Sequence, residues 1–232
     1  MTLQLTVDTL AEGVAELSRR DAHLAAVVAR HGPPPLWDRP PGFETLVQII
    51  LEQQISLSAG RAAYGRLERI AGAVTPERVA SLAESDLRSA GLTRQKSSYI
   101  RGLAVAIVAG EFNPARLPEM DDETARTELI KLKGIGAWTA DIYLLMALGR
   151  ADIWPSGDLA LVAAMREVKR MRSVPSSDRI GQVTNAWRPW RAVAARVLWH
   201  HYLSTPRSRM KVSAGKPSSR RRAGTSRKKR FD

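Results

Sequence analysis

The sequence predicts an all-α protein with two lobes. Apolar residues recur at the spacing of an amphipathic helix along most of the 232 residues. No stretch alternates convincingly between apolar and polar residues, as a half-buried β-strand does. The chain is long enough for one large domain, or for two small lobes that share a cleft.

Proline and glycine set the boundaries of the expected helices. Gly32-Pro33-Pro34-Pro35 ends an N-terminal pair of helices, because proline lacks the amide hydrogen that a helix needs. Thr75-Pro76-Glu77 has the pattern of an N-cap and a first helical turn. The expected helices are residues 8–19, 21–30, 43–70 with a candidate break near Ser56-Leu57-Ser58, a segment after Thr75, 84–91, 94–109, 121–132, 137–148, 158–169 and 187–203.

These helices are expected to form two lobes around one cleft. Residues 44–148 form the predicted central lobe, and residues 149–205 form a C-terminal lobe with which the helices of residues 1–43 pack. Ligand sites are common where lobes meet. We therefore expect the functional site in this cleft, bordered by Asp158.

Positive charge is concentrated at the C-terminus. The formal net charge is +13, of which residues 206–232 carry +10, because they contain eleven Lys or Arg and one acid. This segment has too few apolar residues to fold alone, so a disordered basic tail is expected. Such a tail binds polyanions through counterion release, or it only keeps the protein soluble. The sequence leaves both alternatives open.

Several kinds of site are not expected. The chain has no cysteine, which excludes disulfides, cysteine-ligated zinc and iron–sulfur clusters. His200 and His201 are adjacent and point in different directions on a helix, which disfavours a zinc site. No apolar run reaches the roughly 18 residues of a membrane span, and the N-terminus lacks the pattern of a signal peptide. A cytoplasmic protein with no membrane partner is expected.

The most informative segment is residues 132–158. Gly134 and Gly136 flank Ile135 between two expected helices, and glycine permits positive φ and close backbone approach. The amides that open the next helix suit a phosphate oxygen, and Lys133 adds positive charge beside them. A lone Gly-x-Gly is usually only a turn. The longer pattern Leu-x-Gly-Ile-Gly-x-x-Thr-Ala is more specific, and it indicates a site for a DNA backbone.

Asp158 is the candidate catalytic residue. It follows Pro155-Ser156-Gly157 and opens an apolar-periodic helix, where the helix dipole favours the ionised carboxylate. From the residues alone, a simple N-cap is the commoner function of such an aspartate.

The wider pattern resembles a known family. The segments that carry the resemblance are FETLVQIILEQQISLSAG (43–60), GLTRQKSSYIRGLA (91–104), the 132–158 unit and RPWRAVAARVLWHHYL (188–203). They are similar to the helix-hairpin-helix (HhH-GPD) DNA glycosylase superfamily, and most similar to its 3-methyladenine DNA glycosylase II branch. The resemblance covers most of residues 20–205. It implies a two-lobed helix-hairpin-helix glycosylase fold with the active site in the interlobe cleft.

The resemblance implies a role for each part of the site. Asp158 corresponds to the catalytic aspartate, and Trp138 and Trp199 to aromatic residues of the base pocket, although Trp199 alone resembles a core residue. Gln53 and Gln54 lie where the family inserts a wedge in place of the flipped nucleotide, the alternative being a polar pair at a helix end. The candidates for contact with the DNA backbone are Gly134, Gly136, Lys133, Arg94 and Lys96, with a solvated face as the alternative for the last two.

The family hairpin often binds a monovalent cation, Na⁺ or K⁺, through backbone carbonyls. The resemblance implies that these carbonyls belong to Ile130, Leu132 and Ile135. Carbonyl ligands leave no side-chain pattern, so the sequence neither supports nor opposes this structural ion.

The expected activity is hydrolysis of the N-glycosidic bond of alkylated purines, of the 3-methyladenine or 7-methylguanine type, in duplex DNA during base excision repair. Members of the superfamily that also cut the strand carry a lysine two residues after the second hairpin glycine, as a Schiff-base nucleophile. Trp138 stands there in this chain, so no lyase activity is expected. An alkylated purine is cationic, which favours stacking on indole.

Two alternatives remain open. Ile142 stands where some relatives have an aromatic residue, so a different damaged base, such as hypoxanthine, is the alternative substrate. A non-catalytic helix-hairpin-helix DNA-binding protein is the alternative class, although a mere binder has no reason to keep both Asp158 and Trp138. In either case we expect a monomer that binds double-stranded, damaged DNA in the nucleoid.

Overall fold

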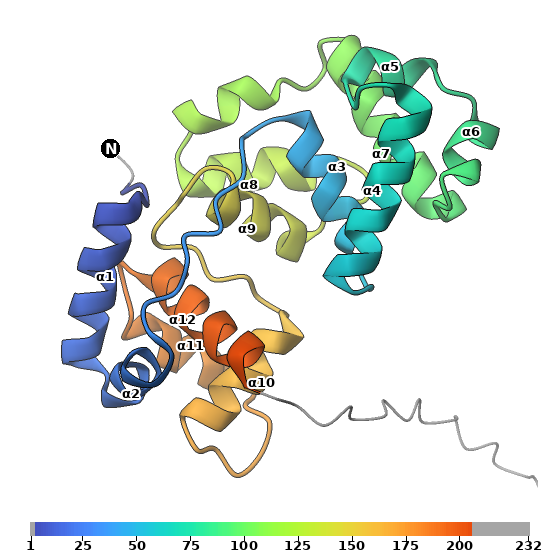
Figure 1. Ribbon diagram of the computed structural model, residues 1–232. Coiled ribbons are helices and arrows are strands. Elements are labelled where there is room, and N and C mark those ends of the chain that lie inside the picture. Colours follow the sequence, from blue (N-terminus) through green and yellow to red (C-terminus); the bar gives the residue numbers. More distant parts are fainter. Residues whose placement is uncertain (1–2, 206–232) are drawn as a thin grey trace, which may run out of the picture.

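The computed structural model describes residues 3–205, and every regular element in that range is a helix (Figure 1). The strand-like pairing in this range is limited to an isolated bridge between Gln4 and Arg150. The predicted all-α class is therefore confirmed. Within the same residues, no helix is both long and apolar enough to cross a bilayer. The basic tail predicted at residues 206–232 lies outside the described residues.

The central lobe is built around helix α3. Leu46, Val47, Ile49 and Ile50 of this helix are fully buried, and α3 contacts α4, α7 and α9. A helix that is apolar on most sides belongs in the middle of a core. The central lobe consists of α3 (Phe43–Glu52), α4 (Leu57–Ala71), α5 (Pro76–Ser81), α6 (Glu84–Ser89), α7 (Arg94–Val108), η1 (Pro114–Glu119), α8 (Asp122–Ile130) and α9 (Ala137–Met146).

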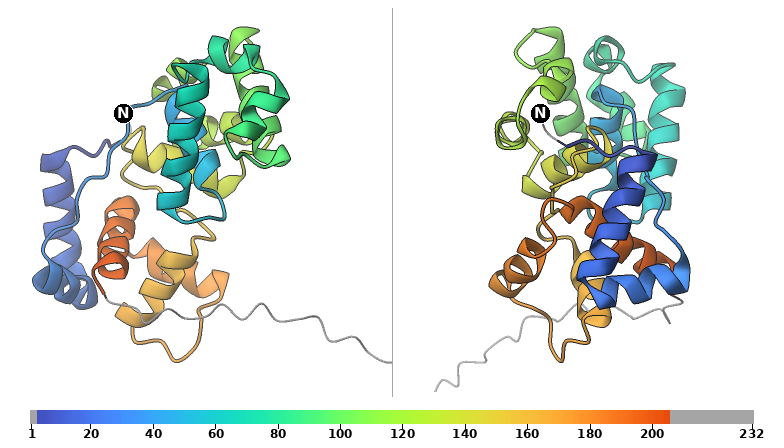
Figure 2. Two further views of the ribbon diagram at one scale, coloured as in Figure 1. Left: turned by 45° about the vertical axis from the view of Figure 1, so that its right-hand side comes forward. Right: turned by 90° about the vertical axis from the view of Figure 1, so that its left-hand side faces the viewer.

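The terminal lobe combines the two ends of the described chain (Figures 1 and 2). Helix α12 is its centre, because it contacts α1, α2 and α10 and buries every residue from Ala192 to Trp199. The N-terminal helices thus complete a core that the C-terminal segment cannot close alone. The terminal lobe consists of α1 (Val7–Arg20), α2 (Ala22–His31), α10 (Leu159–Val168), α11 (Ser177–Asn185) and α12 (Arg191–Ser204).

The structure confirms one predicted break and corrects other helix boundaries. Residues 43–70 form two helices, as the candidate break near Ser56-Leu57-Ser58 predicted, because the chain turns after Glu52 and Ser56 caps α4 by accepting the amide of Ala59 at 3.2 Å. The last helix begins at Arg191 instead of Trp187, since Pro189 interrupts the run of amide donors. Helices η1 and α11 are not expected from the sequence, because both are short, η1 contains two prolines, and each buries one residue.

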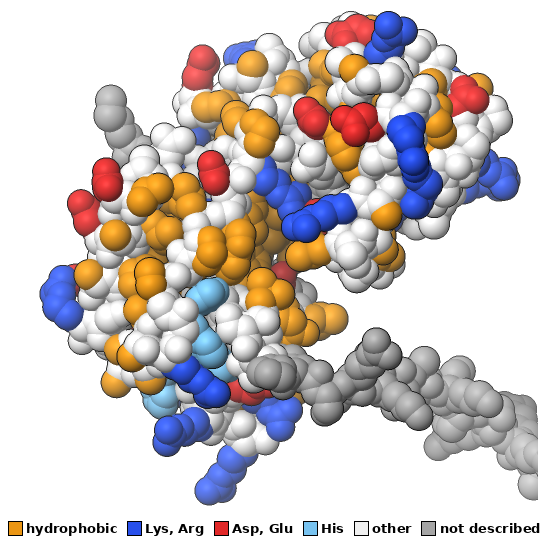
Figure 3. All heavy atoms as spheres, viewed as in Figure 1, with side chains coloured by type: hydrophobic (Ala, Val, Ile, Leu, Met, Phe, Trp, Pro, Cys, Tyr) orange, Lys and Arg blue, Asp and Glu red, His pale blue; other side chains and the backbone are white. Residues whose placement is uncertain are grey.

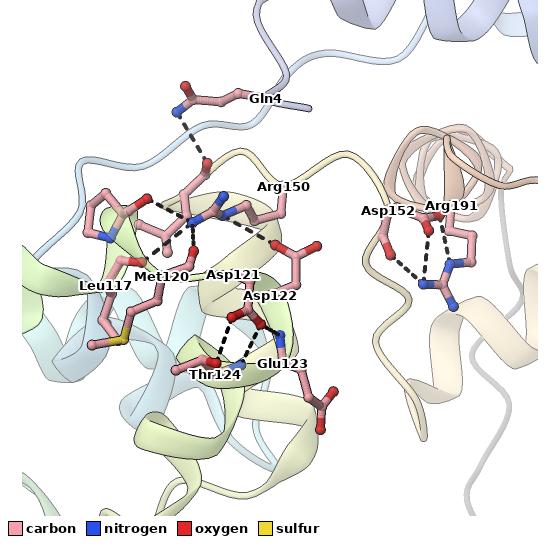
Figure 4. A network of polar contacts seen from close by, with 12 residues as sticks. Gln4, Leu117, Met120, Asp121, Asp122, Glu123, Thr124, Arg150, Asp152 and Arg191 are labelled. Atoms are coloured by element: carbon pink, nitrogen blue, oxygen red, sulfur yellow. Dashed lines mark hydrogen bonds and ion pairs between the residues drawn. The ribbon is translucent and has the colours of Figure 1, made fainter. Parts of the chain in front are cut away.

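The segment that links the lobes is held on both sides by arginine (Figure 4). Arg150 is 6% exposed and donates to three carbonyls of the Leu117–Met120 segment, at 2.7 to 3.4 Å. Two residues later, Asp152 accepts a hydrogen bond from Arg191 of α12 at 2.8 Å. The linking segment is therefore bonded to the central lobe at Arg150 and to the terminal lobe at Asp152.

A second buried guanidinium joins the lobes. Arg196 of α12 is fully buried and donates to the carbonyls of Leu36, at 2.7 Å, and Leu145, at 2.9 Å. Burial lowers the pKa of Arg196 to about 10, which still leaves it charged at neutral pH. Its carbonyl partners lie in the connector before α3 and at the end of α9, so one side chain fixes three segments together.

We expect Arg196→Met to lower the free energy of unfolding by about 3 kcal/mol, because it removes the donors of buried carbonyls. Arg101→Met, at an exposed position on α7, is the control and should change it by less than about 0.5 kcal/mol. Urea denaturation followed by circular dichroism measures both. Equal stability of the two variants would contradict a structural role for Arg196.

Candidate active site

Asp158 lies at the junction of the lobes. It is half-buried and forms the N-cap of α10, where its Oδ1 accepts the amide of Leu161 at 2.8 Å. The preceding Gly157 has φ +83°, a conformation that favours glycine and turns the chain sharply into the helix. The capping role that the sequence suggests is therefore real. The cap uses only one oxygen of the carboxylate, Oδ1.

Two tryptophans complete the surroundings of this carboxylate. Trp138 of α9 donates its indole N–H to Oδ2 of Asp158 at 3.1 Å. Trp199 of α12 donates to Oδ1 at a longer 3.4 Å. The structure thus brings together three residues that the sequence analysis singled out, from both lobes. The stacking of a base on these indoles stays a prediction.

The junction opens into a hollow between the lobes. In the space-filling view, Lys and Arg side chains of the central lobe border this hollow, and apolar side chains line part of it (Figure 3). A concave region with positive charge at its edge suits a polyanion with an apolar moiety that enters the protein.

The hairpin is shaped by a close approach of backbone and ring. Gly134 has φ +91°, and a Cβ on it would lie 2.2 Å from the ring of Tyr99. Gly136, by contrast, is exposed, has open space around it and begins α9 without a side-chain cap. The first amides of α9 therefore have no side-chain acceptor of their own, and a phosphate oxygen suits them.

The two wedge candidates differ in their surroundings. Gln53 donates from Nε2 to the carbonyl of Gly134 and to Oγ1 of Thr139, both at 2.9 Å. It thereby ties the turn after α3 to the hairpin. Gln54 is exposed and has φ +59°, and no hydrogen bond within residues 3–205 engages its side chain. The wedge role remains a prediction for both, and the geometry is more suitable at Gln54.

The basic residues that are candidates for contact with DNA also differ in their surroundings. The ammonium of Lys96 donates to the carbonyls of Leu51, at 2.6 Å, and Gln53, at 2.9 Å, at the end of α3. Burial lowers the pKa of Lys96. In this position Lys96 caps a helix, and its contact with DNA stays a prediction. Arg94 and Lys133 are exposed and remain candidates for phosphate contact.

The carbonyls proposed to bind a monovalent cation come from the same turn. The carbonyl of Leu132 accepts the amide of Ile135 at 3.1 Å. An accepting carbonyl keeps a second lone pair, so this bond is compatible with an ion there. No cluster of acids and histidines in residues 3–205 has the arrangement of a metal site.

Beside Asp158 lies a polar cavity of about 550 Å³, between α8, α9 and α11. Asp141 of α9 lines it and forms an ion pair with Arg126 at 2.7 Å. Burial raises the pKa of Asp141, and the hydrogen bond from Arg126 opposes this shift. The sequence analysis missed this pair. The available signal was an aspartate inside the apolar run of α9, which requires a buried partner.

Three exposed apolar side chains near the site were also missed. Leu159 directly follows Asp158 in the sequence and is 83% exposed. Ile55 and Leu57, which follow Gln54 in the sequence, are 45% and 49% exposed. Exposed apolar groups near a site indicate contact with a partner. In the sequence they resemble core residues, because Leu57 and Leu159 begin α4 and α10 and Ile55 lies just before α4.

Comparisons with known proteins agree with this geometry. Residues 47–189 match the family described as HhH-GPD superfamily base excision DNA repair protein. The DNA-3-methyladenine glycosylase of Bacillus subtilis is 33% identical over 123 residues, which cover 53% of this chain and 41% of the relative. A putative DNA-3-methyladenine glycosylase of the same organism is 29% identical over 187 residues, with 76% and 64% covered. The chain therefore spans less than two thirds of the length of these two relatives.

A solved structure extends the comparison to most of both chains. The DNA-3-methyladenine glycosidase of Bacillus halodurans superposes with a TM-score of 0.70 at 28% identity, and the match covers 84% of this chain and 89% of that one.

The two hairpin glycines provide a matched test of the turn. We expect Gly134→Ala to lower the free energy of unfolding by about 2 kcal/mol or more, because the methyl group meets Tyr99 and φ is positive. Gly136→Ala has an ordinary φ of −91° and open space, so its effect should stay below about 0.5 kcal/mol. Chemical denaturation measures the free energy of unfolding of both variants. Similar losses of stability would contradict the role of Gly134 in the turn.

Proposed function

The chain belongs to the HhH-GPD superfamily of base excision DNA repair proteins, and on this basis we propose that it is a monofunctional DNA glycosylase. Its substrate is an alkylated purine of the 3-methyladenine or 7-methylguanine type in duplex DNA. The names of both Bacillus subtilis relatives and of the Bacillus halodurans structure support this substrate class.

The carboxylate of Asp158 is the observation that carries the proposal. Cleavage of a glycosidic bond develops positive charge on the sugar, in a transition state that resembles an oxocarbenium ion. A fixed anion beside the anomeric carbon stabilises that charge. The same group orients or deprotonates the attacking water. Because alkylation already makes the base a good leaving group, the site needs little acid catalysis.

Recognition of the base is assigned to the two indoles. Trp138 and Trp199 use the edge of the ring for Asp158. Trp138 is only half-buried, whereas Trp199 is 9% exposed, so Trp138 has more of its ring face available for a base. A cationic purine stacks favourably on such a face. Flipping a nucleotide costs a few kcal/mol, and Gln54 is the side chain best placed to replace it in the duplex.

The DNA backbone is assigned to the hairpin. The uncapped amides that follow Gly136, with Lys133 beside them, would hold a phosphate of the damaged strand. Arg94, which is exposed at the start of α7, would hold a second phosphate. We infer that the protein acts as a monomer on double-stranded DNA in the nucleoid.

A different lesion is the second candidate function. Ile142 is buried, with 5% exposure, and has no π face to offer a base. A pocket with fewer aromatic groups tolerates a neutral or larger base, such as hypoxanthine. A panel of oligonucleotides with defined lesions separates the two substrate classes.

We expect Asp158→Asn to reduce the single-turnover release of 3-methyladenine and 7-methylguanine from methylated DNA by at least about a hundredfold, because it removes the negative charge. Asparagine retains the N-cap, so the variant should fold. Asp178→Asn, at an exposed position in the first turn of α11, is the control and should keep full activity. Full activity of Asp158→Asn would mean that the proposed mechanism is wrong.

The absence of lyase activity has a separate test. Because Trp138 replaces the nucleophilic lysine, incubation with damaged duplex and borohydride should trap no covalent protein–DNA adduct. A bifunctional glycosylase in parallel is the positive control. A strong trapped band from this protein would show that it cuts the strand.

A further inference from the structure

We propose that Trp138 is a positioning residue, which orients Oδ2 of Asp158 through its indole N–H, and that Oδ2 is the oxygen that faces the reacting sugar. The inference rests on the proposed function and deepens it. It assigns to Trp138 a task that is separate from stacking on the base.

The hydrogen bonds of the carboxylate distinguish its two oxygens. An ionised carboxylate has about four lone-pair sites, two on each oxygen. Oδ1 receives the amide of Leu161 at 2.8 Å and the indole of Trp199 at 3.4 Å, so both of its sites are used. Oδ2 receives Trp138 at 3.1 Å and keeps one site. That remaining site is the one available to water or to a developing positive charge.

The donor on Oδ2 comes from the other lobe. Leu161 and Asp158 belong to the same helix end, so their bond sets the carboxylate only relative to α10. Trp138 lies in the first turn of α9, two residues after Gly136. Its bond therefore fixes the carboxylate relative to the hairpin. A hairpin that grips the DNA backbone thereby sets the direction of the reactive oxygen.

The turn that carries Trp138 is itself held. Its neighbour Thr139 accepts a hydrogen bond from Gln53 at 2.9 Å, and Gln53 also binds the carbonyl of Gly134. These bonds hold the hairpin carbonyl before Trp138 and the side chain of the residue after it. The indole is thus a rigid donor, and a rigid donor is what positioning of a catalytic group requires.

Replacement of Trp138 by phenylalanine tests the indole N–H alone, because phenylalanine keeps an aromatic ring and removes the donor. We expect Trp138→Phe to lower the single-turnover rate by about tenfold to a hundredfold, as loss of a supporting hydrogen bond does at other sites. Affinity for a duplex with a neutral tetrahydrofuran abasic analogue should stay within about twofold. Trp199→Phe should lower the rate less, since its bond is longer and falls on the oxygen already bound to Leu161.

Trp190→Phe is the matched control. Trp190 is the N-cap residue of α12, and its ring lies where a Cβ on Gly13 of α1 would be, in a part of the terminal lobe that has no role in the proposed site. It should leave the rate unchanged. Thermal denaturation of all variants separates a loss of folding from a loss of rate.

Trp138→Phe combined with Asp158→Asn tests whether Trp138 acts through the carboxylate. If Trp138 acts through the carboxylate, Trp138→Phe has no further effect once the charge is gone. Losses that multiply, or a Trp138→Phe rate equal to that of Trp190→Phe, would overturn the positioning role. Either result leaves the proposed function intact, provided that Asp158→Asn alone shows its expected loss of rate. An active Asp158→Asn variant would instead refute the proposed function.

Discussion

The site depends on one carboxylate that is bonded to both lobes at once. Asp158 receives an amide from its own helix and indole N–H groups from α9 and α12. Because the donors come from different parts of the fold, the position of the negative charge is determined by how the lobes pack. The chemistry therefore depends on the geometry of the whole interface.

Buried arginines bind across that interface. Arg196 binds carbonyls of the connector and of α9, and Arg150 and Asp152 fasten the linking segment to opposite lobes. Directional bonds of this kind define an orientation, whereas apolar burial alone is non-directional. The bonds of Arg150, Asp152 and Arg196 therefore set the orientation of the two lobes.

Much of this architecture could be predicted from the sequence. Helical periodicity was sufficient for the fold class, whereas Asp158, Trp138 and Trp199 were related to one another only through the family resemblance. Periodicity did not reveal α11, because this short helix has only two apolar side chains, Ile180 and Val183, that pack against the core. The sequence also could not separate Gln53 from Gln54 or show that Lys96 caps α3. Neighbouring polar residues look alike until tertiary contacts decide which of them is bound.

The central claim is that a negative charge at Asp158 faces the anomeric carbon of a flipped nucleotide. It is tested most directly by the affinities of the intact protein for two duplexes that differ only in charge at one abasic position, a neutral tetrahydrofuran and a cationic pyrrolidine. The account predicts that the cationic duplex binds at least about tenfold more tightly, a difference of about 1.4 kcal/mol. Equal affinity for the two duplexes would contradict it.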